Sequence, residues 1–110
     1  MFEVTTSATA AGEISVAVAG ECDLSVSDQL MTALHDAVRE APVVIVDFAG
    51  LQFLDSSGVH VLVMADRAAR AAGRHLYVTN AAGVVAHVLD VTGVGDRLSR
   101  PDHGNGSVPI

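Results

Sequence analysis

The segment Asp55–Gly58, with the sequence Asp-Ser-Ser-Gly, holds the residue types in this chain that could do chemistry. It follows Val43–Phe48, a β-branched run that predicts a buried strand, and it precedes residues with the apolar spacing of a helix. Asp55 or Ser56 is therefore expected to cap that helix with a side-chain oxygen. Such a cap leaves a serine hydroxyl at the exposed positive end of the helix, which favours a phosphate there. The segment thus predicts a serine that phosphorylation can switch.

The same serines do not predict a hydrolase. A nucleophilic serine needs a general base and an orienting acid. The candidates for these three roles would be Ser56 or Ser57, His60, and Asp23 or Asp55. The sequence around them has neither the Gly-x-Ser-x-Gly turn nor a loop suited to an oxyanion hole, and a glycine-rich phosphate loop is also missing. We therefore expect that the protein is not an enzyme.

The histidine and cysteine residues lack the spacing of a metal site. The five histidines are His35, His60, His75, His87 and His103. None of them lies three or four residues from another histidine or from Cys22, the single cysteine. Cys22 cannot form an internal disulfide, and its neighbours Glu21 and Asp23 are expected to raise the pKa of its thiol. We expect no metal and no cofactor, and we interpret Cys22 as a small residue at the edge of the core.

The composition and charge of the chain limit the kinds of molecule that it is expected to bind. The 110 residues are enough for one domain, and the formal net charge of −7 disfavours binding to nucleic acid or to an anionic membrane. A basic protein partner suits this charge better. No signal peptide is recognised at the N-terminus, and no apolar run approaches the roughly 20 residues that cross a bilayer. The sequence therefore predicts a cytoplasmic protein.

Hydrophobic spacing predicts the order ββαβαβα. The expected strands are residues 2–7, 14–19, 43–48 and 75–79, with a last short strand at Arg97-Leu98. Residues 20–23 and 49–54 are expected to be connections. The first helix is expected to begin near Ser25 or Ser27 and to end at Ala41-Pro42, the second to run from Asp55 to Gly73, and the third to cover 82–90. This order predicts an α/β fold of mixed α+β type, with an N-terminal antiparallel hairpin, parallel strands after it, and helices packed mainly on one face.

Three segments of the chain resemble the anti-sigma factor antagonists, which are small stand-alone STAS domains of bacteria. Gly20–Asp23 is similar to the Gly-Glu-Leu/Ile-Asp loop of that family. Phe53–Val59 is similar to its phosphorylation motif, an aromatic residue followed by Met/Leu-Asp-Ser-Ser/Thr-Gly-Leu. Val88–Val94 is similar to the late Leu-Phe-Asp-Ile/Met-Thr/Ser-Gly-Leu signature. The order and spacing of these segments make residues 1–100 the expected STAS domain, with 101–110 as a flexible C-terminal tail.

The resemblance implies a role in partner switching. In that family the unphosphorylated antagonist binds an anti-sigma factor that is also a serine kinase, which frees a sigma factor. Phosphorylation of the serine that corresponds to Ser56 ends the binding, and a serine phosphatase restores it. By the same correspondence, Asp23, Asp55, Ser57 and Gly58 are expected to shape the partner-binding surface.

Three departures from the family pattern leave alternatives open, of which the one at His87 replaces a residue that is commonly apolar. His60 stands where the family usually has a second glycine; it flanks Ser56 and is counted among the candidate partner-binding residues. Cys22 stands where the family has an aliphatic residue. The second hypothesis is accordingly a STAS scaffold or regulatory subunit of a larger stress-signalling or transport complex that no kinase controls. The sequence also leaves open whether the protein forms a weak homodimer.

Overall fold

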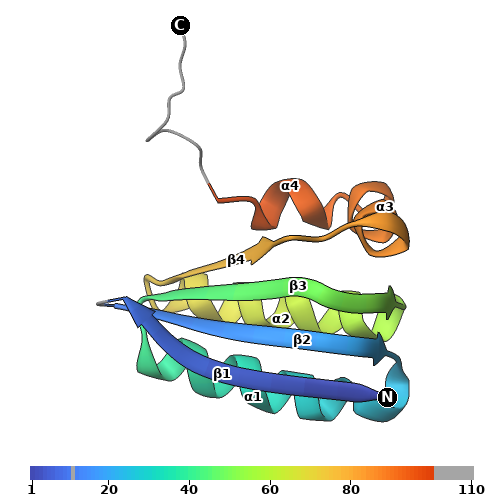
Figure 1. The fold of residues 1–110 in the computed structure, drawn as a ribbon. Coiled ribbons are helices and arrows are strands. Elements are labelled where there is room, and N and C mark those ends of the chain that lie inside the picture. Colours follow the sequence, from blue (N-terminus) through green and yellow to red (C-terminus); the bar gives the residue numbers. More distant parts are fainter. Residues whose placement is uncertain (11, 101–110) are drawn as a thin grey trace, which may run out of the picture.

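A four-stranded sheet organises the protein in the computed structural model, which describes residues 1–10 and 12–100 (Figure 1). The strands are β1 (Phe2–Ala10), β2 (Glu13–Cys22), β3 (Val43–Leu54) and β4 (His75–Thr79). They lie in the order β1-β2-β3-β4, with β1 antiparallel to β2 and the remaining pairs parallel. The predicted N-terminal hairpin and mixed sheet are therefore confirmed.

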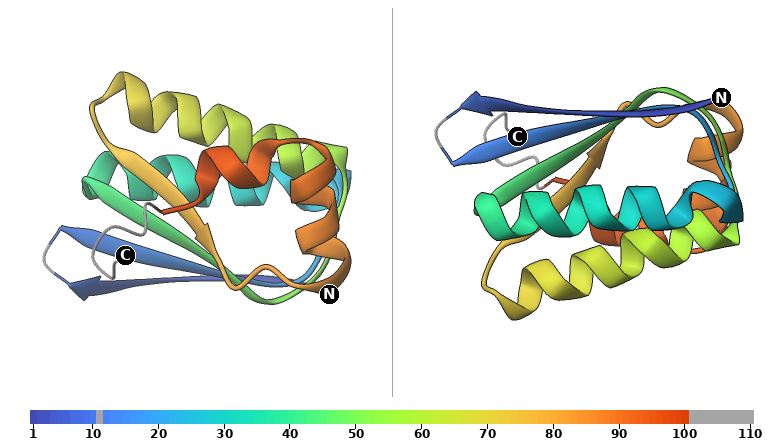
Figure 2. Two further views of the ribbon diagram at one scale, coloured as in Figure 1. Left: turned by 90° about the horizontal axis from the view of Figure 1, so that it is seen from above. Right: turned by 90° about the horizontal axis from the view of Figure 1, so that it is seen from below.

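Two long helices cover one face of this sheet. They are α1 (Ser27–Glu40) and α2 (Ser56–Ala71), which lie side by side beneath the strands (Figure 2). Helix α1 buries an apolar stripe that includes Leu30, Leu34 and Ala37. The sheet supplies the facing layer, because alternate residues of β2 and β3 point toward the helices and are buried. The prediction of an α/β fold with helices mainly on one face is thus confirmed.

The C-terminal end of α2 follows its sequence signal. Ala72 is the last residue near helical geometry, and Gly73 then adopts a positive φ of 71°. The amide of Gly73 donates to the Arg70 carbonyl at 3.0 Å, and the amide of Arg74 donates to the Ala69 carbonyl at 2.7 Å. These two bonds close the last turn as a Schellman motif does, for which glycine is the favoured residue. The predicted cap at Gly73 is confirmed.

Strand β3 is longer than the sequence indicates. Residues 49–54 were expected to be a connection, but they continue β3 and pair with β2 as far as Cys22 and Leu54. The pairing register shifts twice along this stretch, which identifies bulges that accommodate extra residues of β3. Gly50 allows a close approach, since a Cβ there would lie 2.9 Å from the Cβ of Ala19. Residues 20–22, expected in a loop, likewise belong to β2.

Two short helices follow β4, and the expected last strand at Arg97-Leu98 is wrong. They are α3 (Gly83–Val91), which packs on β3, and α4 (Val94–Leu98), which lies beside β4 (Figure 1). Gly93 adopts a positive φ of 76°, and this left-handed residue lets the chain start a second helix directly after α3. Leu98 is buried, as a helical residue facing the core can be.

A buried carboxylate ties α4 to α2. Asp66 is only 2% exposed, and Nε of Arg70 donates to both of its oxygens at 3.1 and 3.0 Å. Nε of Arg97 donates to the same carboxylate at 2.9 Å. A buried carboxylate is stable only when paired in this way, so Arg97 holds α4 against α2 through Asp66.

The predicted flexible tail at 101–110 lies outside the described residues. Within the residues that are described, no helix is both long enough and apolar enough to cross a membrane.

Candidate functional site

Strands β2 and β3 end at the same level of the sheet, and each is followed by an aspartate. Cys22 pairs with Leu54 in the parallel register, so Asp23 and Asp55 leave the sheet side by side. The amide of Asp55 donates to the carbonyl of Cys22 at 3.2 Å and joins the two strand ends. Two of the predicted site residues, far apart in sequence, are therefore brought together by the topology.

Asp55 is the N-cap of α2, which decides between the two caps that the sequence left open. One of its carboxylate oxygens accepts from the amides of Ser57 and Gly58 at 3.0 and 3.2 Å. The same oxygen accepts from the hydroxyl of Ser57 at 2.5 Å. These bonds, above all the one from Ser57, hold the pKa of Asp55 below its ordinary value, although partial burial opposes them. Asp55 is therefore a charged cap, fixed by three donors.

The two serines of the segment have different roles. The Ser57 hydroxyl is committed to Asp55, and its side chain is half-buried. Ser56 is the first residue of α2 and is exposed. Within the described part of the chain, the Ser56 hydroxyl makes no hydrogen bond. Of the two hydroxyls, the one on Ser56 is thus the more available to another molecule.

An open hollow of about 550 Å³ lies beside Ser56, between the start of α2 and the start of α1. The residues that line it are Leu24, Ser27, Asp28, Met31, Asp55, Ser56, Ser57, His60 and Val61. Its lining combines exposed apolar groups with two carboxylates, those of Asp28 and Asp55. Among the described residues that line it, His60 is the only side chain that can carry a positive charge. The structure therefore brings His60 to the same hollow as Ser56.

Gly58 belongs to the packing beneath this surface. It is buried, and a Cβ on it would lie 2.4 Å from Cδ1 of Leu54 and 2.9 Å from Sγ of Cys22. Both distances are shorter than van der Waals contact, so only glycine lets the first turn of α2 approach the strand ends this closely. Gly58 therefore supports the predicted surface from below and is not part of it.

Asp23 caps a helical turn of its own. It accepts from the amide and the hydroxyl of Ser25 at 3.0 and 2.6 Å, at the start of the 3-10 helix η1 (Leu24–Val26). The sequence placed the start of α1 near Ser25 or Ser27, and α1 begins at Ser27. Neither serine side chain caps it: the N-cap is Val26, Ser25 is a donor to Asp23, and the Ser27 hydroxyl donates to the Leu24 carbonyl.

Cys22 lies between the two aspartates and is completely buried. Burial raises the pKa of its thiol to about 11, and the charges of Asp55 and Asp23 add to the shift. The expected direction is confirmed, but burial is the main cause and Asp55, not Glu21, is the larger charge effect. The thiol is therefore a small apolar contact for Gly58, not a reactive group.

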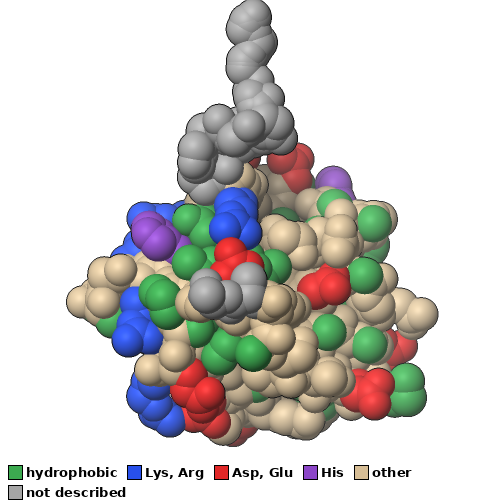
Figure 3. All heavy atoms as spheres, turned by 60° about the vertical axis from the view of Figure 1, so that its left-hand side comes forward, with side chains coloured by type: hydrophobic (Ala, Val, Ile, Leu, Met, Phe, Trp, Pro, Cys, Tyr) green, Lys and Arg blue, Asp and Glu red, His purple; other side chains and the backbone are tan. Residues whose placement is uncertain are grey.

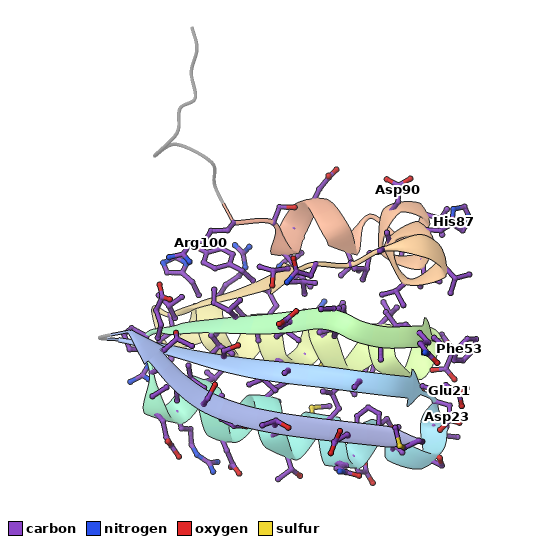
Figure 4. The ribbon with its side chains drawn as sticks, in the orientation of Figure 1. Glu21, Asp23, Phe53, His87, Asp90 and Arg100 are labelled. Carbon is purple, nitrogen blue, oxygen red and sulfur yellow. The ribbon has the colours of Figure 1, made fainter. Side chains whose placement is uncertain are left out.

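Apolar and acidic side chains gather around the strand ends. Phe53 is 45% exposed and Leu24 is 75% exposed. Figure 4 shows Phe53 together with Glu21 and Asp23 at this end of the molecule, with Asp90 of α3 above them. Large exposed apolar groups beside exposed charged groups are typical of a surface that binds another protein.

Arginine side chains lie elsewhere. Arg39 and Arg70 belong to the last turns of α1 and α2, and Arg74 precedes β4, at the opposite end of the parallel strands. Figure 3 turns that end forward and shows arginine side chains along one side of it. The strand-end surface around Ser56 therefore has acidic character, which favours a partner with basic groups.

The sequence did not predict the part of the hollow that η1 and α1 contribute. Leu24, Asp28 and Met31 line it together with the residues of α2. A signal was present at Leu24, which is a large apolar residue directly after a capping aspartate. The contribution of Met31 depends on how α1 packs beside α2, which spacing in the sequence does not encode.

Solved structures of known proteins share this fold. SpoIIAA, an anti-sigma factor antagonist in its unphosphorylated form, has a TM-score of 0.76 at 20% identity over 93% of this chain and 91% of that chain. An anti-sigma factor antagonist from Mycobacterium paratuberculosis has a TM-score of 0.75 at 20% identity over 89% of this chain and 83% of that one. The phosphorylated form of SpoIIAA, a Bacillus cell fate determinant, has a TM-score of 0.70 at 19% identity over 93% and 95%.

At the level of sequence, no curated protein matches the chain significantly. A family model described as "Mlab, STAS domain" matches residues 6–100, which is most of the chain. Together with the sheet order and the two helices beneath it, this match leads to one conclusion. The chain belongs to the STAS-domain family.

Proposed function

We propose that the protein is an anti-sigma factor antagonist controlled by phosphorylation of Ser56. In its unphosphorylated form it binds an anti-sigma factor that is also a serine kinase, and this binding releases a sigma factor. Phosphate on Ser56 ends the binding, and a serine phosphatase restores it. The proposal includes a cytoplasmic location, where the ATP that such a kinase needs is found. It also agrees with the prediction that the chain is not an enzyme, since it acts only as substrate and ligand.

One observation carries this proposal. The Ser56 hydroxyl is exposed and unbonded within the described residues, on the rim of a hollow at the first residue of α2. Its neighbour Ser57 is held by Asp55. A kinase can reach Ser56 without breaking the cap, so phosphorylation changes the surface and leaves the fold intact. Support also comes from the similar structures, two of which are of antagonists in unphosphorylated form and in phosphorylated form.

The physical effect of the phosphate would be electrostatic. Phosphorylation adds a charge of about −1.5 to −2 at neutral pH. Asp55 and Asp28 line the same hollow, so a bound partner would have to desolvate a phosphate beside two carboxylates. A loss of roughly 3 to 4 kcal/mol would weaken binding several hundred-fold. Proposed partner-binding residues are Asp23, Asp55, Ser57 and His60 on this surface, supported from below by Gly58.

The experiment is to incubate the protein with ATP and each candidate anti-sigma kinase of its own genome, and then to measure intact mass and map peptides. We expect one phosphoryl group on Ser56. Ser56→Ala should take up no phosphate and keep its partner, while the matched variant Ser57→Ala should still be phosphorylated at Ser56. Phosphate uptake by Ser56→Ala would move the site to another residue. Ser56→Asp should weaken binding to the partner, and an unchanged affinity would contradict the electrostatic mechanism.

A second candidate function is that of a STAS subunit in a larger assembly without kinase control. Two observations favour it: the family description names Mlab, and His60 occupies the helix turn next to the serine. In that case the surface around Phe53 and Leu24 would bind a constant partner. The absence of phosphate uptake with every kinase, in a folded protein, would favour this function over the first.

A further inference from the structure

Three backbone amides at the start of α2 are already occupied. Those of Ser57 and Gly58 donate to the Asp55 carboxylate, and that of Val59 donates to the Asp55 carbonyl at 3.1 Å. A helix start normally offers such amides to a phosphate. Here a phosphate on Ser56 would have to displace a carboxylate that three donors hold. Because these three amides are occupied, the main partner of that phosphate is expected to be a side chain.

The charged groups of the hollow leave one side chain for this role. Asp28 of α1 and Asp55 of α2 are anions and would repel a phosphate. Leu24 of η1 carries no charge, and Asp23 is not part of the lining. His60 lines the same hollow as Ser56, and it lies four residues further along α2, the spacing that places two side chains on one face of a helix. It is exposed, so its ring is free to turn toward the phosphate.

We propose that His60, as an imidazolium, is the counter-charge of a phosphate on Ser56, and that it makes the charge of the phosphorylated site depend on pH near neutrality. This inference rests on the proposed function for its phosphate. Histidine changes its charge in the pH range where the second ionisation of a phosphoserine also occurs. Protonated His60 would offset part of the phosphate charge, and neutral His60 would leave the phosphate beside two carboxylates.

The test uses full-length protein in which phosphoserine is incorporated at position 56 during translation, so that no kinase is required. Phosphorus NMR follows the second pKa of the phosphate, and proton–carbon NMR follows the pKa of His60. We expect the phosphate pKa to be higher in His60→Gln than in the unsubstituted phosphoprotein by about half a unit or more, as expected for unit charges a few ångströms apart. His60→Lys should restore the low value.

The matched control is His75→Gln. His75 begins β4, opposite Val43 in the register, and therefore lies at the other end of the sheet from Ser56. This substitution should leave the phosphate pKa unchanged. In the unsubstituted protein, the pKa of His60 should rise when Ser56 carries phosphate and that of His75 should not, a comparison that needs no variant.

Equal phosphate pKa values with and without His60, or a His60 pKa that phosphorylation does not raise, would overturn the inference. Its failure is distinguishable from that of the proposed function. If a kinase phosphorylates Ser56 but the phosphate and His60 titrate independently, the proposed role of His60 is wrong and the proposed function stands. If the phosphate and His60 titrate together but no kinase modifies the protein, the electrostatic pairing stands and the proposed control by a kinase is wrong.

Discussion

The two strand ends of this protein carry nearly the same local structure with different consequences. After β2, Asp23 accepts from the amide and hydroxyl of Ser25; after β3, Asp55 accepts in the same way from Ser57. Asp23 caps a turn of three residues, whereas Asp55 caps a helix of 16. The same two-residue spacing thus produces an exposed turn in one place and the start of a long buried helix in the other.

The residues at matching positions account for the difference. The residue after the aspartate is Leu24 in the first region and Ser56 in the second, and both line the same hollow. Three residues after the aspartate stand Val26 and Gly58. Because Gly58 has no side chain, α2 can begin in contact with Cys22 and Leu54. The glycine, more than the cap, thus determines how closely the helix that presents Ser56 packs on the strand ends.

The largest expected effect is that of a side chain at Gly58. We expect Gly58→Val to lower the free energy of unfolding by about 3 kcal/mol, because its Cβ would overlap Leu54 and Cys22. Urea denaturation followed by circular dichroism measures the change. At the matching position, Val26→Ala removes only a half-buried side chain and should cost about 1 kcal/mol or less. Equal effects would show that the two regions do not differ in packing.

Removing the caps should give a smaller and unequal pair of effects. We expect Asp55→Ala to destabilise the protein by about 1 to 2 kcal/mol, since three donors lose their acceptor at the start of α2. Asp23→Ala should cost about 0.5 kcal/mol, at the low end for a cap, because η1 is short and exposed. The same denaturation experiment compares them, and a larger loss for Asp23→Ala would reverse the ranking.

The smallest effect is confined to acid. The pKa of Asp55 in the folded protein is lowered from 3.8, so its charge stabilises the fold above that pH. This stabilisation is lost as the pH falls from 3.8 through the lower folded pKa. Asp55→Asn keeps an oxygen cap but cannot ionise. The amount by which its free energy of unfolding falls short of that of the unsubstituted protein should therefore disappear as the pH falls through that window. Denaturation at a series of pH values measures the deficit, and one that persists below the window would not come from the charge of Asp55.

Much of the site could be predicted from the sequence. The Asp-Ser-Ser-Gly segment between a β-branched run and a helical pattern located Ser56 and its cap, because caps and periodicity are local properties. The hairpin, the two long helices and the glycine at position 73 follow from equally local signals. Two elements were predicted wrongly because they depend on neighbouring elements. The second half of β3 contains bulges, and its Gly50 suggested a turn. Helix α4 is held in place by the pairing of Arg97 with Asp66 of α2.

By itself, the sequence determined that an Asp-Ser-Ser-Gly segment lies at the start of a helix, with Asp55 or Ser56 as its cap, and that the strands and helices form a mixed α/β fold. Only the tertiary structure decided which hydroxyl is free, that Gly58 is buried against Cys22, and that Leu24, Met31 and His60 meet Ser56 in one hollow. The physical reason is one of range. Capping and amphipathic spacing act within a few residues, whereas the hollow exists because parallel β2 and β3 end in register and bring two distant helix starts together.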